Sequence, residues 1–161
     1  MRHIHLTPFS RASIERDLLG GTSIVCDRYA FSGIAFSAAK VAITKNDEGR
    51  EVQEPVLTYE WCKAPDAGLP APDVVIFLDV NPETARKRGG YGEERYEQED
   101  TQRRVKEQFR KIEQDIVKNH TGIEWWTLDA SKSLDEISES IRNLVVLLSD
   151  GVPASVNRLW A

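Results

Sequence analysis

The chain has 161 residues, the size of one domain, with 40 % apolar and 29 % charged residues. This composition excludes a collagen-like, fibrous or wholly disordered chain, and the length allows roughly 70 % of the surface to be buried. The formal net charge of −5 argues against a broadly nucleic-acid-binding surface but allows a local basic cluster.

Several features indicate a protein without a membrane partner. No apolar run approaches the about 20 residues needed to cross a bilayer, and the first residues lack the apolar stretch of a secretion signal. The two cysteines, Cys26 and Cys62, are far apart and suit free thiols in a reducing cytosol. We therefore expect a soluble, cytoplasmic protein.

Helix and strand signals alternate in the first part of the chain. Gly20 and Gly21 end the first helical pattern, because glycine tolerates the left-handed conformation after a helix. The charged and small residues of Thr44–Pro55 predict a solvated surface loop, an insertion between elements. The expected elements are helices at Ser10–Leu19, Ala30–Ala42 and Leu57–Lys63 and a strand at Thr22–Cys26.

The second part of the chain continues the alternation. Val74–Leu78 is a β-branched run typical of a strand buried on both faces, and Asn81 with Pro82 opens a helix that ends near Arg88. Ser133 and Glu136 form a capping box before the last helix, which Gly151 closes. The remaining elements are an amphipathic helix at Asp100–Asn119, a strand at Trp125–Leu128 and a helix whose apolar stripe, running from Leu134 to Leu148, is expected to be buried.

This alternation predicts an α/β domain with a parallel sheet and helices on both faces. Open sheets of this kind bind ligands at the carboxyl ends of their strands. The residues that directly follow each expected strand are therefore the candidates for chemistry.

Asp27-Arg28-Tyr29 follows the first expected strand. The planar guanidinium of Arg28 can hold a phosphate through two hydrogen bonds, and Asp27 can accept a hydrogen bond from metal-bound water. A structural ion pair at a strand end explains the same residues equally well.

Four basic residues surround three glycines in Arg86–Glu97. A closing loop with arginines would supply positive charge and exclude water during phosphoryl transfer, so we interpret this segment as a lid. The alternative is an exposed helix end whose basic residues stabilise the helix dipole. Asp129-Ala130-Ser131-Lys132 follows the last expected strand and could contact a nucleotide base, although capping of the next helix explains part of it.

The phosphate-loop pattern Gly-x-x-x-x-Gly-Lys-Ser/Thr is absent, since none of the ten glycines precedes a lysine. The segments Asp27–Phe36 and Trp61–Asp73, the predicted lid and Asp129–Ser133 nevertheless closely resemble eukaryotic thymidylate kinases. The resemblance covers roughly Ile14 to Ile141 and is interrupted by the insertion.

The resemblance implies a single, partial thymidylate kinase domain over residues 1–161 with the P-loop nucleoside monophosphate kinase fold. It implies transfer of the ATP γ-phosphoryl group to dTMP, giving dTDP for dTTP synthesis, with Mg²⁺ bridging the donor phosphates. It also implies a homodimer in the cytoplasm or nucleus, with no nucleic-acid or membrane partner.

Individual residues match functional positions of that family. Arg28 matches the arginine that binds the acceptor phosphate, Asp27 its neighbour near the metal, and Arg88 and Arg95 lid arginines near the phosphates. The resemblance also implies that Asp27 and Glu97 contact Mg²⁺ through water molecules. The expected acceptor pocket comprises Phe9, Arg28, Ser32, Gly33, Phe36, Tyr96 (beside the sugar 2′ position) and Gln102, and the expected ATP contacts are Arg88, Ala130 and Lys132.

The departures from the family lie at the front of the sequence. Family members carry there a first strand, the phosphate loop, its helix and a second strand. Their first strand lies between the strands that match Thr22–Cys26 and Val74–Leu78, so we expect a gap in the sheet; a makeshift strand at Arg2–Leu6 is the alternative.

The leading interpretation is therefore a thymidylate kinase sequence lacking its amino-terminal segment, weakly active or inactive as this chain. A non-catalytic nucleotide- or partner-binding protein of the same fold is the second interpretation. A kinase for another nucleoside monophosphate is the third.

Overall fold

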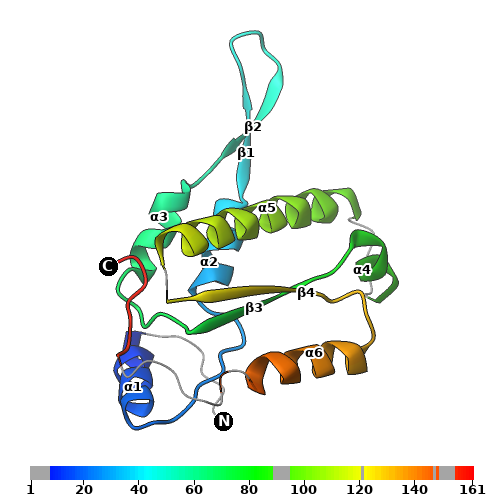
Figure 1. Cartoon of the computed structure of the whole chain (residues 1–161). Coiled ribbons are helices and arrows are strands. Elements are labelled where there is room, and N and C mark those ends of the chain that lie inside the picture. The colour runs from blue at the N-terminus through cyan, green and yellow to red at the C-terminus, as the bar shows by residue number, and fades with distance from the viewer. Residues whose placement is uncertain (1–7, 89–94, 121, 147, 149–154) are drawn as a thin grey trace.

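The computed structural model describes residues 8–88, 95–120, 122–146, 148 and 155–161, with the backbone alone at 8–10 and 95–98. Its centre is a parallel pair of strands, β3 (Val74–Asp79) and β4 (Glu124–Asp129), with Ile76 opposite Trp126. Helix α5 (Arg95–Asn119) lies on one face of this pair and α6 (Leu134–Val146) on the other (Figure 1). The arrangement is the α/β layering expected from the sequence.

The first part of the chain forms helices that pack around this centre. The predicted glycine stop is confirmed, because Gly21 has φ 78° and the N–H groups of Gly21 and Thr22 donate to the carbonyls of Leu18 and Asp17, both at 2.9 Å. The elements are α1 (Pro8–Leu19), α2 (Ala30–Ala38), α3 (Tyr59–Lys63) and the short 3₁₀ helix η1 (Ala64–Asp66).

The strand predicted at Thr22–Cys26 is wrong, because this segment belongs to no sheet in the described part of the chain. The backbone carbonyls of Asp73 and Asp79 accept hydrogen bonds from the N–H groups of Glu124 and Ala130, on the side of β4. In a parallel sheet, successive residues of a strand direct their peptide groups to opposite edges. The peptide groups of Val74, Ile76 and Leu78 therefore face the other edge of β3, where no described residue pairs with them. The expected gap beside β3 is thus present among these residues, and a strand-forming sequence without a neighbour stays irregular. Arg2–Leu6 lies outside the described residues.

The surface loop predicted at Thr44–Pro55 is also wrong, because the insertion is a β-hairpin. Strands β1 (Val41–Lys45) and β2 (Glu51–Pro55) pair antiparallel and project from the body (Figure 1). The turn is held by Asn46, whose Oδ1 accepts the N–H groups of Glu48 at 3.2 Å and Arg50 at 2.8 Å. Since Val41 and Ala42 join β1, the helix predicted over Ala30–Ala42 ends earlier, at Ala38.

The capping signals of the second part are confirmed. Asn81 Oδ1 accepts the Thr84 N–H at 2.8 Å and opens α4 (Pro82–Arg88). Before α6, Glu136 accepts from the Ser133 N–H at 3.0 Å while its own N–H donates to the Ser133 hydroxyl at 3.3 Å. The buried stripe predicted for the last helix is wrong, because a pair of strands is too narrow to cover it: Leu134 is 78 % exposed, and no described residue of α6 is buried. The predicted stop at Gly151 lies outside the described residues. None of the helices in the described ranges is both long and apolar enough to span a membrane.

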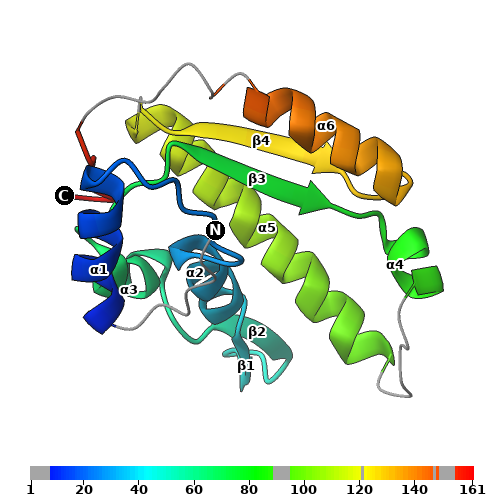
Figure 2. The same ribbon diagram turned by 90° about the horizontal axis from the view of Figure 1, so that it is seen from below.

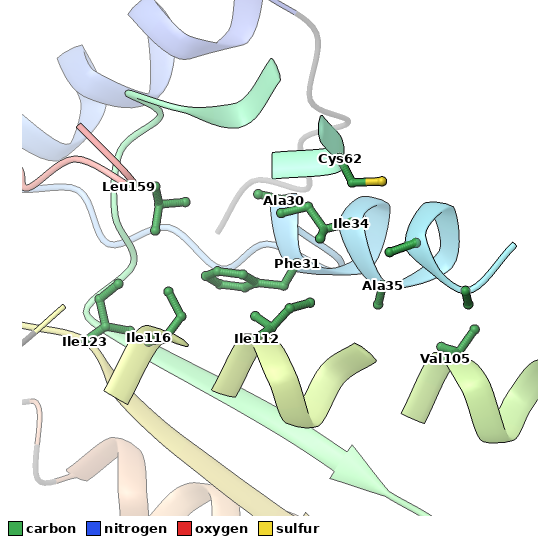
Figure 3. Packing of buried hydrophobic residues seen from close by; sticks show 12 residues of the cluster. Ala30, Phe31, Ile34, Ala35, Cys62, Val105, Ile112, Ile116, Ile123 and Leu159 are labelled. Carbon is green, nitrogen blue, oxygen red and sulfur yellow. The ribbon is translucent and has the colours of Figure 1, made fainter. Parts of the chain in front are cut away.

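The core forms where α2 packs against α5. Ile34 of α2 is 1 % exposed, and Ile112 and Ile116 of α5 are fully buried. The Phe31 ring lies between these helices and the sheet (Figure 3), and it meets Trp125 of β4 edge-on at 5.6 Å. Apolar side chains at helical spacing in both helices produce this contact.

A short segment near the carboxyl end, residues 157–160, crosses the loop before β3, and we call it the C-terminal strap. The Gly68 N–H donates to the Leu159 carbonyl at 2.7 Å, and the Ala71 N–H donates to the Asn157 carbonyl at 2.8 Å. Leu159 is fully buried in the core (Figure 3). Arg158 forms an ion pair with Glu15 of α1, so the strap connects α1 to the loop.

Shortening Ile34 to alanine should lower the free energy of unfolding by about 2–4 kcal/mol, because the vacated space lies in the tightly packed contact between α2 and α5. The matched control is Ile43→Ala in the hairpin, whose side chain is 68 % exposed and whose loss should cost less than about 0.5 kcal/mol. Urea unfolding of both variants measures the difference. Equal effects would contradict the placement of the core.

The ion pair of Glu15 predicts an acid-dependent stability. Hydrogen bonds from Arg158 and Arg11 lower the pKa of Glu15 from 4.5 to about 2. The depressed pKa contributes stability that is fully present above pH 4.5 and is lost as the pH falls toward 2. Thermal unfolding of the wild type and Glu15→Gln should therefore differ at pH 6 and converge near pH 2. A difference that persists at pH 2 would contradict this assignment.

Candidate active site

The carboxyl ends of β3 and β4 open onto a hollow of about 400 Å³. Both arrowheads point toward this edge, next to α4 (Figure 2). Polar residues at the strand ends and just after them make up most of the lining, as the rule for open sheets predicts. The lining residues are Asp79, Asn81, Pro82, Lys106, Thr127, Asp129 and Ser131.

The three residues expected to contact ATP come together beside this hollow. Arg88, the last residue of α4, donates from Nη2 to the Lys132 carbonyl at 2.8 Å and from Nη1 to the Ala130 carbonyl. The guanidinium thus binds the backbone of the loop after β4, rather than lying free at a helix end. This loop and the end of α4 form one polar unit.

The loop after β4 is further held by hydrogen bonds of its own. Asp129 Oδ1 accepts the Ser131 N–H at 2.9 Å, and this backbone bond together with the Ser131 hydroxyl lowers the pKa of Asp129. The Ser131 hydroxyl also accepts from the Asn81 side chain at 2.8 Å. The loop is therefore fixed to the ends of both strands before any ligand arrives.

Sequence reasoning missed the ion pair between Lys106 of α5 and Asp79 at the end of β3, with Nζ and Oδ1 2.7 Å apart. The position of Asp79 directly after an apolar strand run could have identified it. No local sequence signal identifies Lys106, because its contact with Asp79 depends on how α5 crosses β3. The pair places a cation and an anion at the hollow.

The second group of predicted residues surrounds the amino end of α2. Arg28 is exposed with φ 65°, and no described residue pairs with the side chains of Asp27 or Arg28. The amino end of α2 lacks a side-chain cap, so its first N–H groups add partial positive charge beside Arg28. The alternative of a structural ion pair between Asp27 and Arg28 is therefore not what the structure contains.

The predicted acceptor residues of α2 lie on the side of the helix away from the core. Ser32 is half-buried, Gly33 is exposed with open space beside its Cα, and Phe36 is 45 % exposed. Gln102 of α5 is exposed as well. Among the residues that the structure describes, α2 thus has an open face, with the unpaired guanidinium of Arg28 at its amino end.

The adjacent Tyr29 is anchored. Its hydroxyl donates to the Pro70 carbonyl at 2.7 Å, and burial raises the pKa of the Tyr29 hydroxyl, so the proton stays on the donor. Sequence reasoning did not identify this contact, which joins residues 41 positions apart.

Other predicted site residues are not tested by the structure. The side chains of Phe9, Arg95, Tyr96 and Glu97 are not described, and residues 89–94 of the predicted lid lie outside the described ranges. Within those ranges, no group of three His, Cys, Asp or Glu side chains could hold a metal ion. The Mg²⁺ role of Asp27 and Glu97 therefore stays a prediction.

Comparison with known proteins agrees with this geometry. The family model described as thymidylate kinase matches residues 2–141. The chain belongs to the thymidylate kinase family. The family resemblance and the α/β fold of nucleoside monophosphate kinases expected from the sequence are thus confirmed.

Among individual relatives, the thymidylate kinase of Schizosaccharomyces pombe is 46 % identical over 78 % of this chain and 51 % of that protein. The thymidylate kinase of Danio rerio is 39 % identical, over 91 % of the chain and 61 % of that protein. A solved thymidylate kinase from Candida albicans superposes with a TM-score of 0.70 at 29 % identity, over 94 % of this chain and 67 % of its own. The chain thus spans about half to three fifths of the length of these curated relatives.

Replacing Arg88 by glutamine should loosen the loop after β4, because its backbone carbonyls lose a charged donor. We expect amide hydrogen exchange at Ala130 and Ser131 to become about five- to tenfold faster. The matched control is Lys87→Gln on the same helix, where Lys87 pairs with Glu83 on an exposed surface. Unchanged exchange in Arg88→Gln would show that the loop is held without Arg88.

Proposed function

We propose that this chain serves the thymidylate kinase reaction, in which the γ-phosphoryl group of ATP is transferred to dTMP to give dTDP. The observation that carries the proposal is the exposed guanidinium of Arg28, which no described residue pairs with, at the amino end of α2, where no side chain caps the helix. A charged fork beside free N–H groups suits a phosphate monoester. Family membership gives the class of acceptor.

The open face of α2 supports a nucleoside beyond that phosphate. Phe36 offers an aromatic surface to a methylated pyrimidine, and Gly33 leaves room for close approach. Ser32 supplies a hydroxyl for the base or sugar. Phe9, Tyr96 and Gln102 complete the proposed pocket, with Tyr96 beside the sugar 2′ position to disfavour ribonucleotides.

The donor nucleotide is proposed to bind at the loop after β4. Ala130 and Lys132 would contact the adenine, and Arg88 and Arg95 the phosphates. When bound, Mg²⁺ would bridge and neutralise the donor phosphates. The exposed carboxylate of Asp27 suits an ion held through water, and Glu97 is the second proposed carboxylate.

How fast this chain catalyses the reaction by itself is a separate question. Phosphoryl transfer depends on positioning of the donor phosphates, and the sequence contains no Gly-x-x-x-x-Gly-Lys pattern to cradle them. We therefore propose that this chain by itself transfers phosphate weakly or not at all. The same observation favours the second candidate function, a nucleotide- or partner-binding protein without catalysis.

The remaining biological context is also proposed from the family. It comprises a role in dTTP synthesis, a cytoplasmic or nuclear location, assembly as a homodimer, and no nucleic-acid or membrane partner.

Calorimetric titration tests the acceptor site. We expect dTMP to bind with an affinity that Arg28→Ala lowers about 10- to 100-fold, because a charge-assisted contact to phosphate is lost. The control is Arg110→Ala, an exposed arginine of α5. The absence of dTMP binding, or an equal loss in both variants, would contradict the proposed acceptor site.

Coupled detection of ADP with dTMP, ATP and Mg²⁺ tests catalysis in the same preparation. We expect little or no ADP formation above the protein-free rate. We also expect the chain to bind dTMP and to bind ATP only weakly. Turnover near that of an intact family member, assayed in parallel, would overturn the proposal of weak activity. Binding of dTMP with no ATP binding and no turnover would favour the non-catalytic alternative.

Competition among dTMP, dUMP and CMP tests the choice of acceptor. The Candida albicans structure is reported to reveal the origin of a broad substrate specificity, so the choice has to be measured for this chain. We expect the deoxynucleotides to displace bound dTMP better than CMP. Stronger displacement by CMP would identify a different monophosphate as the acceptor.

A further inference from the structure

The backbone of Arg28 is strained in a manner that calls for support from its surroundings. Its φ of 65° lies in the left-handed region, which is unfavourable for a residue with a side chain. Such a conformation persists only where neighbouring structure fixes it. The Arg28 side chain contributes no support, since no described residue pairs with it.

The support comes from the next residue, Tyr29. Its hydroxyl donates to the buried Pro70 carbonyl at 2.7 Å, and its ring packs edge-on against Phe31 at 6.3 Å. Both contacts fix where the chain enters α2. Tyr29 therefore holds the carboxyl side of Arg28.

Pro70 is in turn held by the C-terminal strap. Gly68 and Ala71, on either side of Pro70, both donate backbone hydrogen bonds to the strap. The strap itself is fixed by the buried Leu159 and by Trp160, whose Nε1–H donates to Asp115 of α5 at 3.1 Å. A continuous set of contacts thus runs from α5 through the strap and Pro70 to the residue beside Arg28.

We propose that Tyr29 is a positioning residue that keeps Arg28 aimed at the acceptor phosphate, and that the C-terminal strap acts on Arg28 through Pro70. This inference rests on the proposed binding of the dTMP phosphate by Arg28. A bidentate contact between a guanidinium and a phosphate needs both groups aligned, so a small rotation of the turn weakens it. Binding of the thymidine part, on the face of α2, does not depend on that alignment.

The test is the ratio of the dissociation constants of thymidine and dTMP, which isolates the gain in affinity due to the phosphate. Tyr29→Phe removes the hydrogen bond to Pro70 and keeps the ring. We expect this variant to bind thymidine as tightly as the wild type does. The ratio of the dissociation constants of thymidine and dTMP should fall about fivefold.

The control is Ser133→Ala. The Ser133 hydroxyl accepts from the Glu136 N–H at 3.3 Å at the start of α6, which lies on the opposite face of β3 and β4 from α5. This variant should lower the urea midpoint, because the helix cap is lost, and leave the thymidine to dTMP ratio unchanged. Equal ratios in the two variants would overturn the role of Tyr29, because both would then act only through stability.

Trp160→Phe tests the strap. It removes the bond to Asp115 while keeping an aromatic ring that can pack near Phe31, which Trp160 meets edge-on at 5.9 Å. We expect a loss of the phosphate-dependent gain in the same direction as in Tyr29→Phe, but smaller. An unchanged ratio would overturn the contribution of the strap.

The wild type separates this inference from the proposed function. If the wild type binds dTMP no better than thymidine, the role of Arg28 in phosphate binding fails and this inference fails with it. A second outcome is that the wild type shows the phosphate-dependent gain in affinity, that Arg28→Ala abolishes this gain and that Tyr29→Phe keeps it. In that case the acceptor site stands, and only the positioning role of Tyr29 is refuted.

Discussion

The packing of α2 against α5 is the contact on which the other features depend. Ile34, Ile112 and Ile116 are almost fully buried there, and each such side chain contributes about 1.5–3 kcal/mol. Helix α2 carries Arg28 at its amino end, and α5 carries Lys106 to the end of β3. The same apolar interface therefore sets the separation between the proposed acceptor and donor sides of the site.

The parts of the fold that could be predicted are those specified by local sequence. The capping box of Ser133 and Glu136 and the glycine stop at Gly21 depend on neighbouring residues alone, and both are confirmed. The hairpin at Val41–Pro55 was not predicted, because its alternation is short and interrupted by charges. Thr22–Cys26 shows the opposite error, since strand propensity cannot supply a partner strand.

The candidate site could be predicted in its motifs but not in its contacts. The position of Arg28 after an expected strand indicates a phosphate site, and the resemblance groups Arg88 with Ala130 and Lys132, which lie together in the structure. The attachment of Arg88 to backbone carbonyls, the Lys106–Asp79 pair and the Tyr29–Pro70 bond join residues tens of positions apart. Such contacts follow from helix crossing and chain path, which periodicity does not reveal.

The edge of β3 that no described residue pairs with has a consequence for the protein in concentrated solution. Val74, Ile76 and Leu78 present peptide groups that no described residue satisfies, on a strand whose side chains are apolar and half-exposed. An edge of this kind is a template for any extended segment of another molecule. Wherever that edge is open, self-association would compete with solvation, and a rise in protein concentration would favour association.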